Sequence, residues 1–185
     1  VLYHYQMSTV TNKRIKKMTS SERFRRVTRF ESVDRLPVVE WAPYWKLTLE
    51  RWEDEGLRAH DPHERHRQFG LDVWAPIGLR PCKPPDHFIT NEDDYERFKT
   101  DIFPENPLHI EDLQKAETAR RQGDAVVWLV LDGFFWFPRK LMGIERHLYA
   151  FYDQPDLMRR MNEDLLAFYF RWLDALCELV KPDLM

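Results

Sequence analysis

The sequence predicts an α/β protein in which helices cover a parallel sheet. Three observations support this prediction. Val126–Leu131 is an unbroken apolar run, as expected of a strand that is buried on both faces. The stretch that starts at Pro155 repeats apolar residues at helical spacing over many turns. Helical and strand-like segments alternate along the chain, which is typical of parallel strands joined by helices.

The first expected elements lie before residue 75. Thr19 and Glu22 form a capping box, which predicts a helix from this point onward. Pro37 cannot continue a helix and favours a short strand over residues 38–41. The next expected segments are a helix at 44–56, a short helix or turn at 60–70 and a strand at 71–74.

The remaining elements begin with a proline-rich stretch. Residues 76–91 contain Pro81, Pro84 and Pro85 and are expected to form a loop. Gly123 marks the end of a helix, because glycine is the preferred residue after a helical C-terminus. The expected segments are a helix at 92–98 capped by Asn91, a helix at 110–122, the strand at 126–131, the long helix from Pro155 and a strand beginning at Leu184.

Composition limits the class of protein. The 185 residues are enough for one domain, with a flexible basic tail at 1–17 and the domain at 18–185. Lys plus Arg is 28 and Asp plus Glu is 31, a balance that argues against a nucleic-acid partner. No apolar run reaches the ~20 residues that span a bilayer, and no signal-peptide pattern is present. The sequence therefore predicts a cytoplasmic protein without a membrane partner.

Side chains suited to ligand binding follow the strand at 126–131. Ligands of parallel sheets gather at the carboxyl ends of the strands. We therefore expect this loop to form an aromatic wall with cations that face an anionic substrate group. Its candidate residues are Asp132, Phe134, Phe135, Trp136, Arg139 and Lys140. The alternative for the two cations is a charged helix start that is exposed to water.

Three histidines at three-residue spacing invite a metal interpretation. His60, His63 and His66 drift around a helix, since 3.6 residues make one turn, and "HERH" is not the HExxH pattern. We favour a solvated polar helix, and we assign no metal ligand in this chain.

Three stretches together resemble the uroporphyrinogen decarboxylase superfamily, which includes the zinc-dependent cobamide–thiol methyltransferases. They are "MTSSERFRRVTRFESVDRLPVVEW", "FGLDVWAPIG" and "GFFWFPRKLMGIERHLYAFYDQPDLMRRM". The family fold is a TIM (β/α)8 barrel of about 250 residues. The resemblance therefore implies that residues 18–185 are the N-terminal half of such a barrel in a truncated chain.

The resemblance also implies roles for particular residues. Asp72 matches the aspartate that stabilises the cationic pyrrole intermediate in the decarboxylases, although it also fits a turn aspartate. Glu40, Trp41 and Trp45 stand where the decarboxylases carry substrate-binding arginines, and Leu141 lies near the position of their active-site tyrosine. A polyanionic porphyrinogen is repelled by Glu40, so the methyltransferase branch is the closer match.

The expected partner is a small molecule: a tetrapyrrole, a corrinoid-bound methyl group or a methylated aromatic compound. Zinc and a corrinoid belong to the complete protein, because the metal ligands of that branch would lie beyond Met185. The fragment alone is expected to be inactive and to form a homodimer or aggregate through its open strand edge. The competing hypothesis is a non-catalytic binding or scaffold module built from a shortened barrel.

Overall fold

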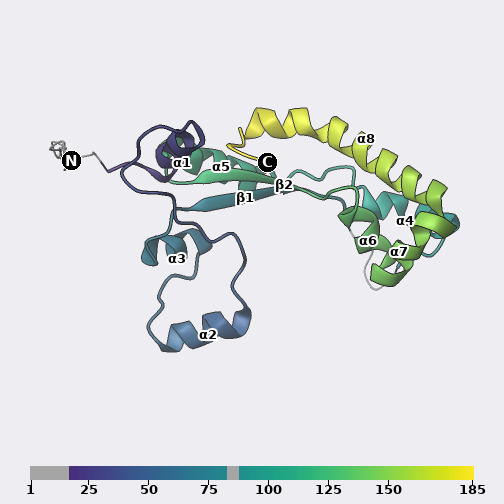
Figure 1. The fold of residues 1–185 in the computed structure, drawn as a ribbon, viewed down its shortest axis with the longest axis horizontal. Coiled ribbons are helices and arrows are strands. Elements are labelled where there is room, and N and C mark those ends of the chain that lie inside the picture. The colour runs from purple at the N-terminus through teal and green to yellow at the C-terminus, as the bar shows by residue number, and fades with distance from the viewer. Residues whose placement is uncertain (1–16, 83–87) are drawn as a thin grey trace, which may run out of the picture.

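The computed structural model describes residues 17–82 and 88–185, so residues 1–16 of the expected tail and 83–87 of the expected loop lie outside it. The described elements alternate between helix and strand (Figure 1). In chain order they are α1 (Ser20–Thr28), α2 (Lys46–Asp54), α3 (Pro62–Gln68), β1 (Trp74–Leu79), α4 (Glu92–Ile102), α5 (Ile110–Gln122), β2 (Val126–Leu131), α6 (Trp136–Met142), α7 (Ile144–Asp153) and α8 (Pro155–Leu179).

The helix ends carry the caps that the sequence predicts. The Thr19 hydroxyl accepts a hydrogen bond from the Glu22 N–H at 3.2 Å and caps α1. Asn91 caps α4 by accepting from the Asp94 N–H at 2.9 Å. Gly123 ends α5 with φ +81°, in the left-handed region that glycine adopts without strain.

The sheet is parallel and follows chain order. β1 pairs with β2 in a register that runs from Trp74 opposite Val126 to Leu79 opposite Leu131. On the other edge of β2, Leu184 forms a parallel bridge with Trp128. The strand expected to begin at Leu184 is present as this single bridge, and the described residues form no further strand there. The α/β prediction is confirmed, and the described residues form an open two-stranded sheet.

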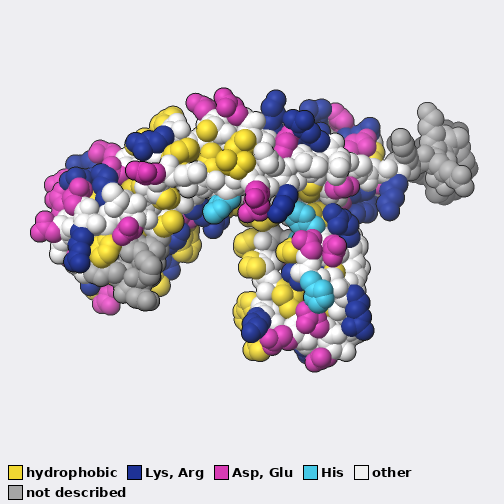
Figure 2. Space-filling view, turned by 180° about the vertical axis from the view of Figure 1, so that it is seen from behind, with side chains coloured by type: hydrophobic (Ala, Val, Ile, Leu, Met, Phe, Trp, Pro, Cys, Tyr) yellow, Lys and Arg dark blue, Asp and Glu magenta, His cyan; other side chains and the backbone are white. Residues whose placement is uncertain are grey.

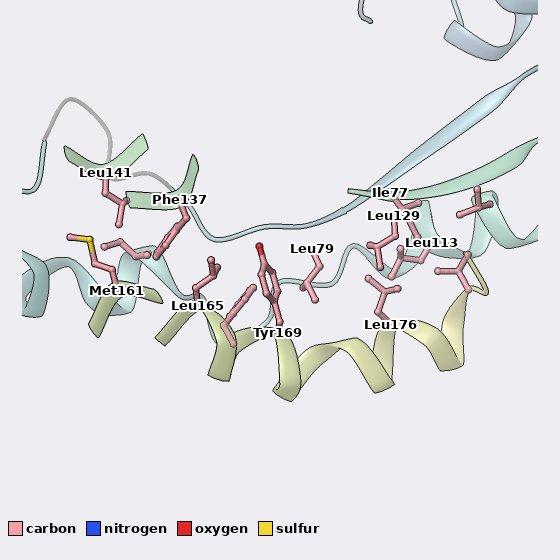
Figure 3. Close-up of a cluster of buried hydrophobic side chains, with 14 of the residues drawn as sticks. Ile77, Leu79, Leu113, Leu129, Phe137, Leu141, Met161, Leu165, Tyr169 and Leu176 are labelled. Atoms are coloured by element: carbon pink, nitrogen blue, oxygen red, sulfur yellow. The ribbon is translucent and has the colours of Figure 1, made fainter. Parts of the chain in front are cut away.

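Helices cover one face of this sheet. Side chains that alternate along β1 and β2, including Ile77, Leu79 and Leu129, point to α5 and α8 and are almost wholly buried. Figure 3 shows α8 presenting Leu176 to Ile77 and Leu129 of the strands, and Leu165 to Phe137 of α6. The helical spacing that begins at Pro155 therefore produces the main core contact.

The opposite face of the sheet is open. It carries the other half of the strand residues, and Pro76 and Gly78 on β1 are exposed. Trp74 and Trp128 are half-buried on the same face. α2 and α3 project from this side as an arm, and a recess separates the arm from the lobe that contains α4, α6 and α7 (Figures 1 and 2).

One expected strand is absent and another is misplaced. Residues 38–41 form no strand, although the Asp72 N–H donates to the Val38 carbonyl at 2.8 Å. β1 begins at Trp74, the last residue of the strand expected at 71–74. It extends to Leu79 and so includes the first residues of the loop expected at 76–91. Pro76 is compatible with β1 because the described part of the chain leaves one edge of this strand unpaired, so the missing N–H breaks no ladder bond there.

The segment after β2 is more helical than expected. α6 begins at Trp136, so Arg139 and Lys140 lie on a helix and not in a loop. Gly143, with φ +79°, then separates α6 from α7. Among the described residues, no helix has the length and apolar character to cross a membrane.

Candidate functional site

A pocket of about 560 Å³ lies on the open face of the sheet, against the arm that carries α2 and α3. Three tryptophans form its sheet side: Trp74 from β1, Trp128 from β2 and Trp41 from the segment before α2. We call it the tryptophan pocket. Clefts with largely aromatic walls and a few polar groups are the usual sites for small molecules.

The tryptophan rings pack edge to face in a row. The centroids of Trp74 and Trp128 are 5.8 Å apart at an interplanar angle of 71°. Trp41 and Trp128 follow at 6.5 Å and 77°. This geometry suits the charge distribution of aromatic rings and gives a rigid wall. Trp41 is 68% exposed, so the wall still offers a large apolar surface to a ligand.

The arm contributes polar groups to the same pocket. Glu40 lines it, and one of its carboxylate oxygens accepts a hydrogen bond from the Ala42 N–H at 3.0 Å. His66 is 8% exposed, and its ring packs edge to face on Tyr44 with centroids 6.5 Å apart. Burial lowers the pKa of His66 below its ordinary value, so the imidazole is neutral at pH 7.

Arg80 joins the pocket to the carboxyl ends of the strands. It follows β1, and the stem of its side chain lies 3.9 Å from the position that a Cβ on Gly78 would occupy. Its guanidinium is half exposed and stands 3.9 Å from the Asp132 carboxylate. Lys140 pairs with Asp132 at 2.6 Å, and among the described residues the Arg80 guanidinium donates no hydrogen bond, so it can bind an anionic group.

Asp72 lies at the other end of the sheet. It precedes β1, whereas Asp132 follows β2, and the strand between these ends is about 20 Å long at ~3.3 Å per residue. One Asp72 oxygen accepts from Arg23 and from Ser20 at 3.0 Å. The other accepts from Arg35 at 2.6 Å and from the Val38 N–H at 3.0 Å.

These contacts make Asp72 a buried structural carboxylate. Burial by itself would raise its pKa, but the bonds from the Val38 N–H and Arg35 outweigh that effect and hold the pKa below its ordinary value. The side chain is 2% exposed. Asp72 therefore stands apart from the tryptophan pocket, and its oxygens are occupied by the protein.

The aromatic residues after β2 pack mainly with α6 and α7. Phe135 stands 4.7 Å from the ring of His147. Arg139 lies over the Trp136 ring, with its guanidinium carbon 4.5 Å from the centroid, a cation–π contact within the protein. Phe134 is half exposed beside them. Trp45, at the start of α2, is 82% exposed and lies outside the pocket lining.

The structure thus brings together part of the predicted site. Glu40 and Trp41 share the tryptophan pocket, and Arg80 links it to Asp132 and Lys140. Sequence reasoning missed Trp74, Trp128 and Arg80. For the two tryptophans a signal existed: side chains alternate between the two faces of a strand, so Trp74 and Trp128 lie on one face once the register is known.

The histidine helix differs from its expected form. His66 is buried against Tyr44, so the prediction that α3 is solvated is wrong for this residue, whereas His60 is exposed. Within 17–82 and 88–185, no group of three or more His, Cys, Asp or Glu side chains is placed to hold a metal ion. The described residues by themselves therefore form no zinc site.

Comparison of the chain with protein-family models, with curated proteins and with solved structures finds no match. The fold and the site define its class: an α/β protein with an open two-stranded parallel sheet and an aromatic pocket on the uncovered face.

Proposed function

We propose that the chain supplies the first strands of a uroporphyrinogen decarboxylase-like (β/α)8 barrel enzyme, and that the tryptophan pocket is its substrate site. The observation that carries the proposal is the pocket itself: a row of tryptophans on the uncovered face of parallel strands, with Glu40 and Arg80 beside it. In a barrel this face turns inward, and the active site lies at the carboxyl ends of the strands, where Arg80 follows β1.

The strand order supports the barrel. β1, β2 and the bridge at Leu184 are parallel neighbours in chain order, and the helices between them include α5 and α8 on the opposite face. A singly wound barrel has the same arrangement. Eight strands are needed to close it, so the remaining strands would come from sequence outside the described residues.

Within this family, Glu40 favours methyl transfer over porphyrinogen decarboxylation. Its carboxylate lines the pocket, and the described chain contains no ion pair that neutralises it. A carboxylate placed beside Glu40 would be repelled, whereas Arg65 and Arg80, which also line the pocket, could hold the single anionic group of a smaller substrate. A methylated aromatic compound or a corrinoid-bound methyl group would gain the aromatic contacts without that repulsion.

The pocket is tested by equilibrium dialysis with 2-isopropenylnaphthalene, an apolar planar probe. We expect Trp128→Ala to weaken binding by about tenfold, since an aromatic contact and its buried area are worth more than about 1 kcal/mol. Trp45→Ala is the matched control, because this ring is exposed outside the pocket. Equal affinity in both variants, or no binding by the unaltered protein, would contradict the proposal.

The choice between branches is tested with uroporphyrin, a stable polycarboxylate analogue of the decarboxylase substrate. We expect weak binding by the unaltered protein and tighter binding by Glu40→Gln, because the substitution removes a negative charge from the pocket. Tight binding that Glu40→Gln leaves unchanged would favour the decarboxylase branch.

One observation favours a non-catalytic module as the second candidate. Asp72, the one residue that the family resemblance marks as catalytic, has both oxygens bonded within the protein. The test uses a polypeptide that holds all the barrel strands and measures uroporphyrinogen turnover and methyl transfer from methylcobalamin to a thiol. The absence of both activities would favour the non-catalytic module.

A further inference from the structure

Three buried nitrogen atoms around the tryptophan pocket have no hydrogen-bond partner among the described residues. They are Arg65 Nε, His66 Nδ1 and Trp74 Nε1, and all three side chains line the pocket. The indole and guanidinium nitrogens can only donate, and an imidazole donates from at least one of its nitrogens. Native proteins rarely leave a buried N–H unpaired, because its lost hydration costs about 1–3 kcal/mol.

His66 is the most enclosed of these side chains. At 8% exposure it is more than nine-tenths buried, yet the structure records no hydrogen bond to its ring among the described residues. An edge-to-face contact with Tyr44 holds the imidazole instead. Its Nδ1 has almost no exposed surface, so it reaches a ligand in the pocket only when the ring rotates, and such a rotation would break no hydrogen bond.

The surrounding charges favour a neutral imidazole. Glu40 and Asp61 act to raise the pKa of His66, but burial and the neighbouring His63 and Arg65 lower it by more. A neutral imidazole at pH 7 offers one N–H donor and one acceptor. With Trp74 and Arg65 nearby, the unpaired groups of the pocket are mainly donors.

We infer that the ligand of the tryptophan pocket is an aromatic compound that carries a hydrogen-bond-accepting oxygen, and that His66 donates to this oxygen. The inference rests on the proposed function, because it names the ligand class of the same site. The apolar body of the ligand packs on Trp41 and Trp128, and its oxygen pairs with donors that the protein leaves unsatisfied. Specificity arises because a ligand without the oxygen leaves those donors buried and unpaired.

The test compares two probes of similar shape in equilibrium dialysis: 2-acetylnaphthalene, which carries a carbonyl, and 2-isopropenylnaphthalene, which lacks it. We expect His66→Phe to reduce the preference for the carbonyl probe by about threefold to tenfold, the range for one net hydrogen bond. His60→Phe is the matched control, because this side chain is 82% exposed and lies outside the pocket lining, and it should leave the preference unchanged.

A second substitution keeps the inference testable if His66→Phe does not fold. Trp74→Phe keeps an aromatic ring on the wall and deletes the indole N–H, and it should also reduce the preference. Circular dichroism spectra would establish that each variant is folded. The ¹⁵N resonances of His66 should shift more with 2-acetylnaphthalene than with 2-isopropenylnaphthalene, because only the first accepts a hydrogen bond, whereas a purely structural histidine would respond equally to both.

The outcomes separate the two proposals. If both probes bind and Trp128→Ala weakens both, but neither His66→Phe nor Trp74→Phe changes their ratio, the donor inference is overturned and the pocket stands. If the unaltered protein binds neither probe, both the proposed substrate site and the donor role of His66 are contradicted. A preference that is lost equally in His60→Phe would also overturn the assignment to His66.

Discussion

A single carboxylate ties the first helix to the first strand. Asp72 joins Arg23 of α1 to the start of β1, and Arg23 also forms a paired contact with Asp34, with both distances 2.7 Å. The side chains of Arg23 and Asp72 are 3% and 2% exposed. A buried cation that loses one of its partners keeps its desolvation cost, so this contact matters for folding more than a surface pair would.

Asp72→Asn is therefore expected to destabilise the protein by about 3–5 kcal/mol, because it leaves Arg23 partly uncompensated in the interior. Urea denaturation followed by circular dichroism measures the change. Asp156→Asn removes an exposed pair with Arg159 and should cost about 0–1 kcal/mol. Equal, small effects of both substitutions would mean that the Asp72 contacts are not structural.

The sequence carried only part of this information. Asp72 attracted a catalytic interpretation because it matches an aspartate of the uroporphyrinogen decarboxylases, with a turn aspartate as the alternative. Its actual partners are Ser20, Arg23 and Arg35, which are 52, 49 and 37 residues away along the chain. Pairing over such separations depends on how α1 crosses the sheet, which no local pattern encodes.

A second buried group links stability to pH. His147 on α7 is fully buried, and neither ring nitrogen has a hydrogen-bond partner in the described residues. Phe135 and Phe151 pack on its ring. Burial, followed by the nearby Arg139, lowers the pKa of His147 in the folded protein. The unfolded chain therefore binds a proton at a higher pH than the folded one does.

Stability should accordingly fall as the pH drops below about 6.5, where unfolded histidine takes up its proton. One such group contributes at most about 1.4 kcal/mol per pH unit. The buried carboxylates take up protons at lower pH. The change in urea midpoint between pH 7 and 5 therefore reports mainly the protonation of histidines. His147→Leu should flatten this dependence, whereas His109→Gln, on an exposed residue, should not. An unchanged slope in His147→Leu would contradict the assignment.

At the scale of elements, one glycine fixes how α5 meets α1. Gly123 ends α5 in the left-handed region, and the Ser21 N–H donates to its carbonyl at 3.3 Å. A Cβ on Gly123 would lie 2.8 Å from the Thr19 hydroxyl oxygen, which caps α1. The end of one helix thus contacts the cap of the other, and only a residue without a side chain allows this approach.

Gly123→Ala should therefore cost more than its backbone strain alone. Gly70→Ala is the matched control, since Gly70 has φ +71° and a Cβ added there would meet nothing within 4 Å. The control should lose about 1–2 kcal/mol from the left-handed backbone, and Gly123→Ala should lose more because Thr19 must move. Urea midpoints measure both, and equal losses would mean that the contact with Thr19 is easily relieved.

Elements with local signals are the ones that sequence reasoning located. β2 and α5 have the predicted bounds, because an unbroken apolar run and a terminal glycine define them locally. β1 was misplaced because Pro76 and Gly78 argue against a strand. Only the position of β1 at the sheet edge makes these residues acceptable, and that position is a property of the whole fold.

For the whole molecule, the open face of the sheet is the dominant feature. Trp41 and Pro76 are exposed there, and the described residues leave one edge of β1 without a partner strand. Unpaired strand edges and broad apolar surfaces are the usual routes to self-association. The chain studied by itself should therefore form dimers or larger species through this region.

Light scattering across a range of protein concentrations tests this expectation. Pro76→Lys places a charge on the exposed edge strand without touching the core and should shift the chain toward monomer. Gln114→Lys adds the same charge on α5, away from the open face, and should leave association unchanged. A monodisperse monomer of the unaltered chain at all concentrations would mean that the arm of α2 and α3 shields this surface in solution.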